Sequence, residues 1–199
     1  MSAQVNNPGR YVANFSENAF VERAKRAAVA LLGTRAVLDY EQLLEKRPQK
    51  LNAAFPMHAD MHYWPRRFPR GAFTKTATFS LAVTDADESN GCLRVLPGSG
   101  RATRRGRGAA KANARAVAVE LTDAEAATAR PLPVRRGDVT IHDEWILHGS
   151  GGNPSDRVRK TYVVAFRDRR MVDYERSVGF AHSYNDDPEV IRRIRAGEL

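Results

Sequence analysis

The feature that most constrains the fold is a succession of short segments with strand character. Residues 73–84 read FTKTATFSLAVT, a run of β-branched and aromatic residues with alternation that is typical of a β-strand. Similar segments continue as far as residue 166, separated by polar turns that often contain Gly or Pro. They are residues 92–96, 117–121, 138–142, 144–148 and 161–166. Many short strands after a single helix predict a mainly β fold, either closed or built from two sheets.

The chain begins without clear periodicity and then offers one amphipathic helix. Residues 1–15 contain Asn-Asn-Pro-Gly and are expected to form an irregular lead-in. Ser16 can cap a helix over residues 17–32, and Gly33 is a suitable end for it. The apolar stripe predicted for this helix comprises Phe20, Ala24, Ala27, Ala28 and Leu31. Shorter helices are expected over residues 122–129 and near residues 188–196.

The stretch FPMHADMHYWP places His58 and Asp60 two positions apart. In an extended strand, the side chains of residues i and i+2 point to the same face, so this imidazole and this carboxylate can converge. A third ligand is offered by His148, within WILHGSGGNPSDRVRKTYVVAF. Two histidines and one carboxylate form the facial triad of non-haem iron oxygenases, which leaves positions on the ion open. The alternative is that both histidines are satisfied polar residues at strand ends.

An arginine beyond this third ligand is placed where it could bind a carboxylate. Arg159 lies eleven residues after His148 and opens a β-branched segment. Its planar guanidinium could hold a carboxylate through two parallel hydrogen bonds, which a lysine could not do. Ser150 lies two positions beyond His148, so its hydroxyl could share that face and add a hydrogen bond. Arg157 is the rival, because it would share the face of Arg159 if the strand began earlier.

The segments HADMHYWP, NGCLRVLPGS and HGSGGN, with the spacing of Arg159, resemble the phytanoyl-CoA dioxygenase family, which includes ectoine hydroxylase. The resemblance covers about residues 46–166. It implies a double-stranded β-helix, which is a cupin-like jelly roll, with flanking helices. It also implies Fe(II) bound by His58, Asp60 and His148, with 2-oxoglutarate and O2 as co-substrates. The activity implied is hydroxylation of an unactivated carbon of a small molecule, with production of succinate and CO2.

Three further residues are interpreted through this resemblance. Lys46 matches a lysine that points into the active site of relatives, so residues 36–46, which by pattern could be helix or strand, are expected to form a strand. The alternative is a solvated lysine before the turn at Pro48. Asp60 argues for hydroxylation, because halogenating relatives carry a small residue in its place. Gly100 stands where relatives usually have a histidine, a departure that concerns the substrate pocket rather than the metal ligands.

Side chains close to these segments could line a substrate pocket. His62 lies two positions beyond the metal-binding aspartate, and Tyr63 and Trp64 could stack against a substrate, although aromatic residues more often belong to a core. His142 is expected to be a packed strand residue rather than part of a proton relay. Cys92 is expected in the core, because no neighbour in the sequence would activate its thiol.

The chain is strongly basic, with 32 Lys and Arg against 23 Asp and Glu, a net charge of +9. This balance favours acidic partners, including nucleic acid and small anionic substrates such as a dicarboxylate or a CoA ester. Residues 101–115 carry six cations and no acid, which indicates a solvated basic loop, an arm for nucleic acid or a device that captures an anionic substrate. No aromatic residues are interleaved there for base stacking, so a small-molecule substrate is the expected partner and nucleic acid is disfavoured.

The length of 199 residues is sufficient for one domain with a sizeable core, expected to span residues 1–199. Only 45 residues precede Lys46, which predicts a shortened N-terminal part; a catalytically silent binding protein of the same fold is therefore an alternative. A single cysteine excludes an intrachain disulfide and suits the reducing cytoplasm. No apolar run approaches the ~20 residues of a membrane span, and the first residues lack the apolar core of a secretory signal.

Overall fold

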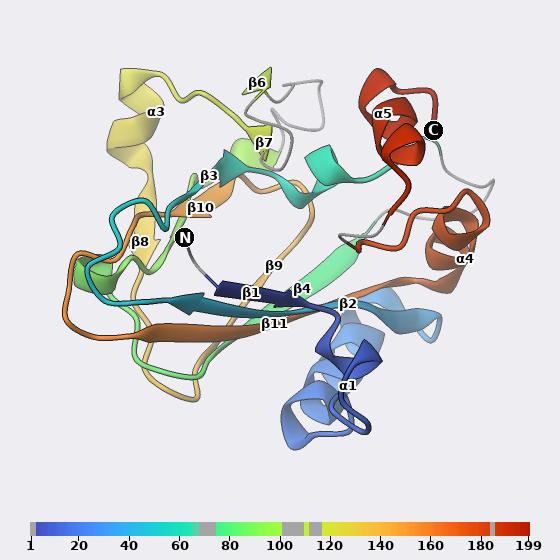
Figure 1. The fold of residues 1–199 in the computed structure, drawn as a ribbon, viewed down its shortest axis with the longest axis horizontal. Coiled ribbons are helices and arrows are strands. Elements are labelled where there is room, and N and C mark those ends of the chain that lie inside the picture. The colour runs from blue at the N-terminus through green and yellow to red at the C-terminus, as the bar shows by residue number, and fades with distance from the viewer. Residues whose placement is uncertain (1–2, 66, 68–74, 101–109, 112–116, 184–185) are drawn as a thin grey trace.

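The computed structural model describes residues 3–65, 67, 75–100, 110–111, 117–183 and 186–199, and its two main β-sheets are stacked face to face (Figure 1). The large sheet has the strand order β1 (Ala3–Asn6), β2 (Ala36–Lys46), β11 (Arg159–Asp168), β4 (Thr76–Ala82) and β9 (Val139–His142). The small sheet has the order β3 (Phe55–His58), β10 (His148–Ser150), β5 (Leu93–Val95) and β8 (Arg130–Leu132).

Every neighbouring pair of strands in these two sheets is antiparallel. From β2 onwards, consecutive strands alternate between the large and the small sheet, except that β8 follows β5 within the small sheet. The eight antiparallel strands that follow β1 in these two sheets form a jelly roll, the double-sheet architecture that pairs most strand edges internally. The predicted double-stranded β-helix with flanking helices is confirmed.

The core on the outer face of the large sheet is formed by helix α1 (Ala19–Leu32) and alternate residues of the strands beneath it (Figure 1). Tyr162, Val164 and Phe166 of β11 are buried there, since side chains two apart on a strand share a face. The Phe166 ring meets Phe79 of β4 edge to face, with ring centroids 6.0 Å apart. The intervening residues of β11 are left to face the space between the sheets.

The N-terminal part differs from expectation in three respects. Asn18 caps α1, because its side chain accepts hydrogen bonds from the backbone N–H groups of the first turn, while the Ser16 hydroxyl contacts Glu41 instead. The predicted stripe is confirmed at Ala24 and Ala28, which are buried, and at Phe20 and Ala27, which pack against the same core, but Leu31 is 57% exposed, and the stripe also includes Val21 and Leu32. The lead-in is partly ordered as β1, which pairs with residues 42–45 of β2.

Residues 36–46 form a strand, as the resemblance implied, because β2 pairs along its whole length with β11. The predicted strand over residues 144–148 is wrong for most of its length. The Asp143 carboxylate accepts hydrogen bonds from the backbone N–H groups of Trp145 and Ile146, so the chain turns there and β10 begins only at His148.

The short helix α3 (Asp123–Thr128) is confirmed, and its capping box joins Thr122 to Glu125. The other elements with described bounds are β6 (Ala110–Lys111), β7 (Val117–Ala118), η1 (Pro8–Arg10), η2 (Asp60–Tyr63) and η3 (Glu88–Asn90). Apart from β6, the basic segment 101–115 lies outside the described residues, so its predicted loop character stays a prediction.

The C-terminal part adds helix α4 (Arg169–Ser177), which the sequence did not suggest, and helix α5 (Pro188–Ala196), which it did. Both lie at one end of the two sheets (Figure 1). Apolar residues around α5 pack against the segment that follows β3, in a buried cluster of Met61, Trp64, Phe180, Ile194 and Leu199. Among the described residues, no helix combines the length and apolar character needed to cross a membrane.

Candidate active site

The three predicted metal ligands come together because β3 and β10 are neighbours in the small sheet. His58 and His148 are directly opposite in this antiparallel pair, although 90 positions separate them in the chain. Asp60 follows β3 as the first residue of η2. One oxygen of its carboxylate, Oδ1, lies 3.4 Å from His148 Nε2 and 3.9 Å from His58 Nε2. The predicted convergence of the three side chains is therefore observed.

Backbone carbonyl groups fix the orientation of both imidazoles. His58 Nδ1 donates to the carbonyl oxygen of Pro56 at 2.7 Å, and His148 Nδ1 donates to that of Ile146 at 3.1 Å. A carbonyl can only accept, so the proton of each neutral ring lies on Nδ1 and the lone pair of Nε2 faces the Asp60 carboxylate. Such an outer hydrogen bond is how metal-binding histidines are usually held.

Burial and mutual proximity set the charge states of these groups. Burial lowers the pKa of His58 and the pKa of His148, and for His148 the result is about 3, with the nearby His58 as the next contribution. Burial alone would raise the pKa of Asp60, but the imidazoles of His148, His142 and His58 outweigh it and hold this pKa below its usual range. Two neutral imidazoles and one carboxylate result, which is the protonation state that metal binding requires.

The donor set and its spacing fit a divalent transition-metal ion. Atoms bound at about 2.1 Å to one ion lie at most about 4.2 Å from one another. The distances from Asp60 Oδ1 to the two histidine nitrogens, 3.4 and 3.9 Å, are within this limit, and the three ligand atoms all lie within 4.8 Å of one another. Imidazole and carboxylate ligands on one side of an ion match the facial arrangement of ferrous oxygenases.

Beside this site, the side chains of Arg159 and Lys46 face the same cavity, which has a volume of about 800 Å³. The two residues are register partners across β11 and β2, and both are buried. Lys46 Nζ donates to Ser150 Oγ at 2.6 Å and also contacts the carbonyl oxygen of Gly151. Arg159 donates through Nη1 to the Gly91 carbonyl oxygen at 2.5 Å, and its Nε is buried with no hydrogen-bond partner in the described part of the chain.

Among the described residues, neither of these two cations forms an ion pair with a carboxylate. Burial lowers the pKa of Lys46 to about 7, with the positive charge of Arg159 as the next contribution, and burial also lowers the pKa of Arg159. An anion placed between them would relieve this repulsion. Arg157, the rival to Arg159, instead lies on the outer surface, where its guanidinium binds the Asp87 carboxylate at 2.8 Å.

The predicted substrate-pocket residues are divided between the cavity wall and the core. His62, Tyr63 and Trp64 all line the cavity. The Tyr63 hydroxyl accepts a hydrogen bond from the backbone N–H of Val117 at 3.1 Å, and its ring meets the edge of His58. Trp64 is only 6% exposed and its ring stacks on the Arg167 guanidinium at 4.1 Å, so most of its surface supports the core.

Two residues that contact Asp60 were not predicted as part of the site. His142 was expected to be a packed strand residue, but its Nε2 lies 3.4 Å from Asp60 Oδ2, and Thr78 Oγ1 donates to the same oxygen at 3.3 Å. The alternation along β9 could have suggested this, because Thr140 and His142 must share one face. His142 and Thr78 both line the cavity. The packing predicted for Cys92 is confirmed, because its thiol is free and buried.

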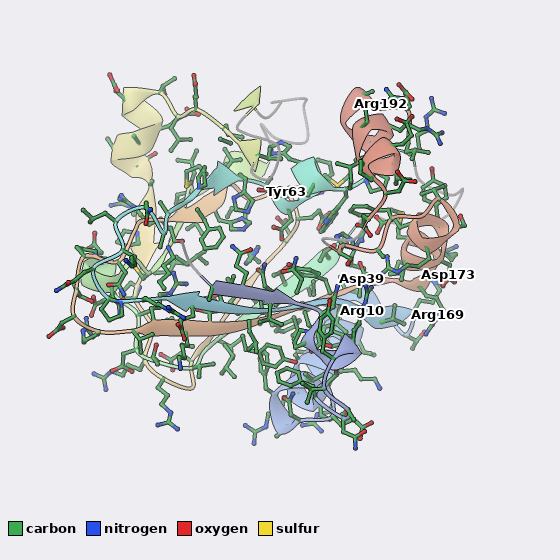
Figure 2. The ribbon with its side chains drawn as sticks, viewed as in Figure 1. Arg10, Asp39, Tyr63, Arg169, Asp173 and Arg192 are labelled. Atoms are coloured by element: carbon green, nitrogen blue, oxygen red, sulfur yellow. The ribbon has the colours of Figure 1, made fainter. Side chains whose placement is uncertain are left out.

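A buried charged cluster, also unpredicted, closes the cavity at the end near α4. Arg167 binds Asp39 at 2.7 Å and Glu175 at 2.6 Å, and His182 Nε2 lies 3.1 Å from the same glutamate. No local pattern indicates this cluster, because its members come from β2, β11, α4 and the segment that follows α4. Figure 2 shows Asp39 on the large sheet and Tyr63 on the segment above it, and both residues line the cavity.

A jelly roll with two histidines and one carboxylate on its small sheet belongs to the class of folds that carry non-haem iron oxygenase sites. The sequence profile of the family described as phytanoyl-CoA dioxygenase (PhyH) matches residues 3–161, most of the chain. The chain therefore belongs to the phytanoyl-CoA dioxygenase family.

Individual relatives are distant in sequence. The peroxisomal phytanoyl-CoA dioxygenase of Bos taurus is 28% identical over 141 residues, which cover 68% of this chain and 41% of the relative. The chain thus spans about two fifths of the length of the curated relatives it matches. EvdO2 from Micromonospora carbonacea var. aurantiaca has the same fold, with a TM-score of 0.73 and 22% identity over 94% of this chain and 71% of that protein. It was also solved in complex with 2-oxoglutarate.

Another similar structure is that of the epimerase SnoN in complex with Fe3+, alpha-ketoglutarate and nogalamycin RO. It is 21% identical, with a TM-score of 0.65 over 84% of this chain and 63% of that protein. At this level of identity, the likeness establishes the fold that this chain shares with SnoN and EvdO2.

Proposed function

We propose that this protein is an Fe(II)- and 2-oxoglutarate-dependent dioxygenase that hydroxylates an unactivated carbon of a small molecule. The observation that carries the proposal is the convergence of His58 Nε2, Asp60 Oδ1 and His148 Nε2, with both imidazoles held by backbone carbonyls so that their lone pairs face the same point. Membership of the phytanoyl-CoA dioxygenase family supports the same reaction.

His58, Asp60 and His148 are the residues that would hold the ion. A ferrous ion with 2-oxoglutarate and O2 supplies the oxidising chemistry, in which decarboxylation to succinate and CO2 accompanies hydroxylation of the substrate. The chain contributes fixed ligand directions and a partly enclosed cavity. Asp60 supplies a carboxylate to this set of three ligands, and the presence of a carboxylate supports hydroxylation rather than halogenation.

Arg159 is the residue that would bind the distal carboxylate of 2-oxoglutarate, with Lys46 and Ser150 as further donors. Arg159 is buried, faces the cavity, and has an Nε–H group without a partner among the described residues. A carboxylate there would receive charge-assisted hydrogen bonds and reduce the repulsion between two buried cations. EvdO2, which has the same fold, was solved in complex with 2-oxoglutarate, which supports 2-oxoglutarate as the acid bound here.

For the rest of the cavity we propose a neutral, hydrogen-bonding small molecule, in place of the anionic substrate that the net charge favoured. The lysine and arginine side chains among the described cavity residues are Lys46, Arg159 and Arg167. The first two are assigned to 2-oxoglutarate, and Arg167 is already neutralised by buried carboxylates. The same wall, formed by the large sheet, also carries amide and hydroxyl groups: Asn6 Oδ1 on β1 accepts hydrogen bonds from Tyr40 and from Gln42 on β2.

The compartment proposed for this reaction is the reducing cytoplasm. The single cysteine, Cys92, is a free thiol buried in the core beside β5. Its pKa is raised by burial, so the thiol stays protonated and takes no part in the chemistry proposed here.

Anaerobic titration with Fe(II) and 2-oxoglutarate tests the proposed function directly, through the weak visible charge-transfer band of the chelate. The band is expected in the wild type, absent in His148→Ala and weakened in Arg159→Ala. Arg157→Ala is the matched control, because this arginine lies two positions away on the exposed surface. Absence of the band from folded wild-type protein would leave the catalytically silent binding protein as the better description.

Succinate production tests the proposed class of substrate. Small molecules grouped by charge are screened for stimulation of 2-oxoglutarate turnover, and the strongest responses are expected from neutral compounds with hydroxyl or amide groups. Gln42→Leu should then lower kcat/KM for those compounds without changing the Fe(II) and 2-oxoglutarate band. Strong responses confined to dicarboxylates or CoA esters would contradict the assignment of a neutral substrate.

A further inference from the structure

His142 lines the cavity, and its imidazole is buried there without a hydrogen bond among the described residues that would account for its position. It is the last residue of β9, is the register partner of Thr78 on β4, and its side chain is only 9% exposed. In the described part of the chain, neither of its ring nitrogens makes a hydrogen bond. Buried polar groups usually have a partner, so an unpartnered imidazole beside a ligand site indicates a task at that site.

Nε2 of His142 lies close to the carboxylate of Asp60, whose two oxygens have different neighbours. Oδ1 lies 3.4 Å from Nε2 of His148 and 3.9 Å from Nε2 of His58. Oδ2 instead accepts a hydrogen bond from the Thr78 hydroxyl at 3.3 Å and lies 3.4 Å from Nε2 of His142. Oδ1 therefore faces the two predicted histidine ligands, and Oδ2 faces His142 and Thr78 of the large sheet.

We infer that His142 is a positioning residue that donates a hydrogen bond from Nε2–H to Oδ2 of Asp60, so that the carboxylate binds the metal through Oδ1 alone. This inference rests on the proposed metal site. A carboxylate held in this way fills one coordination position instead of two. Together with the two histidines it leaves three positions of an octahedral ion, enough for a chelating acid and one further ligand.

The alternative role for His142, as a fourth metal ligand, is disfavoured by geometry. The group of ligand atoms within 4.8 Å of one another comprises those of His58, Asp60 and His148, and His142 does not belong to it. Its ring lies beside the His148 ring at 4.4 Å between centroids, on the side of the carboxylate oxygen that faces the sheet. Thr78 already donates a hydrogen bond to the same oxygen, so the surroundings of Oδ2 suit a hydrogen-bonding role for His142 rather than a metal-binding one.

Titration of the metal-free protein with Co(II) tests the inference without relying on catalysis. His142→Phe keeps the ring shape and removes the donor, and we expect it to weaken Co(II) binding about 10- to 100-fold and to change the visible Co(II) spectrum. His142→Gln can reach the same oxygen with its amide N–H and should largely restore both. Thr140→Val, on the same face of β9, is the control and should bind Co(II) as the wild type does.

Each outcome decides the matter. If His142→Phe is folded and binds Co(II) with the wild-type affinity and spectrum, the positioning role is refuted. If the Gln and Phe variants lose binding equally, His142 is a ligand and the inference is also wrong. If His142→Phe does not fold, Thr78→Val removes the second donor to the same oxygen and should weaken binding in the same direction. Wild-type protein that binds no Co(II) would overturn the metal site itself.

Discussion

Substitution of Lys46 should change how the stability of the protein depends on pH. Burial lowers the pKa of this lysine from 10.5 to about 7 in the folded chain, whereas the unfolded chain retains the ordinary value. Between these two values the unfolded state binds more protons than the folded state, so the free energy of unfolding rises with pH. Integrated from about pH 6.5 to about pH 9.5, the Lys46 contribution is about 3 kcal/mol.

Urea unfolding of the wild type and of Lys46→Met at several pH values measures this contribution. The variant lacks the titrating group, so the wild type should gain about 3 kcal/mol relative to it across that interval. Lost packing and lost hydrogen bonds to Ser150 affect the difference equally at every pH and therefore cancel. Lys25→Met, on the exposed face of α1, is the matched control. If the free energy of unfolding depends on pH in the same way for the wild type and for Lys46→Met, the lowered pKa of Lys46 in the folded chain is refuted.

The same lysine should make 2-oxoglutarate binding depend on protons. A carboxylate placed between Lys46 and Arg159 would raise the pKa of Lys46, so binding near pH 8 should take up a proton. Calorimetric titrations in buffers of different ionisation enthalpy report this uptake, and it should disappear in Lys46→Met. Equal proton uptake by the variant would show that the 2-oxoglutarate carboxylate does not bind beside Lys46.

The remaining predictions concern the arginine, the core and one turn. Arg159→Lys should weaken 2-oxoglutarate binding about 10- to 100-fold by calorimetry, since a charged hydrogen bond contributes about 1.5–3 kcal/mol, while Arg157→Lys should not; equal effects would contradict the assignment. Phe166→Ala should lower the free energy of unfolding by about 3–5 kcal/mol in urea, against at most about 0.5 kcal/mol for exposed Val139→Ala. Gly91→Ala should destabilise by more than about 1 kcal/mol in the same assay, because φ is 75° and the added Cβ would lie 2.4 Å from a carbonyl oxygen; an unchanged midpoint would show that the turn relaxes.

The metal ligands could be proposed from the sequence because part of their geometry is local. His58 and Asp60 are two positions apart, and the extended backbone of Ala59 between them brings the two side chains to one side of the chain. The third ligand required knowledge of strand pairing. That β10 lies directly beside β3, with His148 opposite His58, is a property of the whole jelly roll and has no local signal.

Where local and non-local forces compete, the sequence was less informative. Residues 36–46 suit helix or strand by pattern, and pairing with β1 and β11 on both sides decides for a strand. Ser16 and Asn18 are both good caps, and the structure uses Asn18 while Ser16 contacts Glu41. His142 was expected merely to pack, since nothing in its neighbourhood in the sequence reveals that β9 carries it to the carboxylate of Asp60.

The pairing of His58 with His148 also governs how the chain can vary and how it must fold. In the unfolded chain the two imidazoles are the ends of a loop of about 90 residues, so a metal ion cannot gather the full ligand set before the small sheet has assembled. The ion therefore binds the folded chain much more tightly than the unfolded chain, and this difference in affinity stabilises the folded state. The entropy of closing so long a loop depends weakly on its length: removal of the 15 residues 101–115 would change it by only about 0.2 kcal/mol. Evolution can therefore lengthen or shorten the connection between the ligands with little thermodynamic consequence for the site they form.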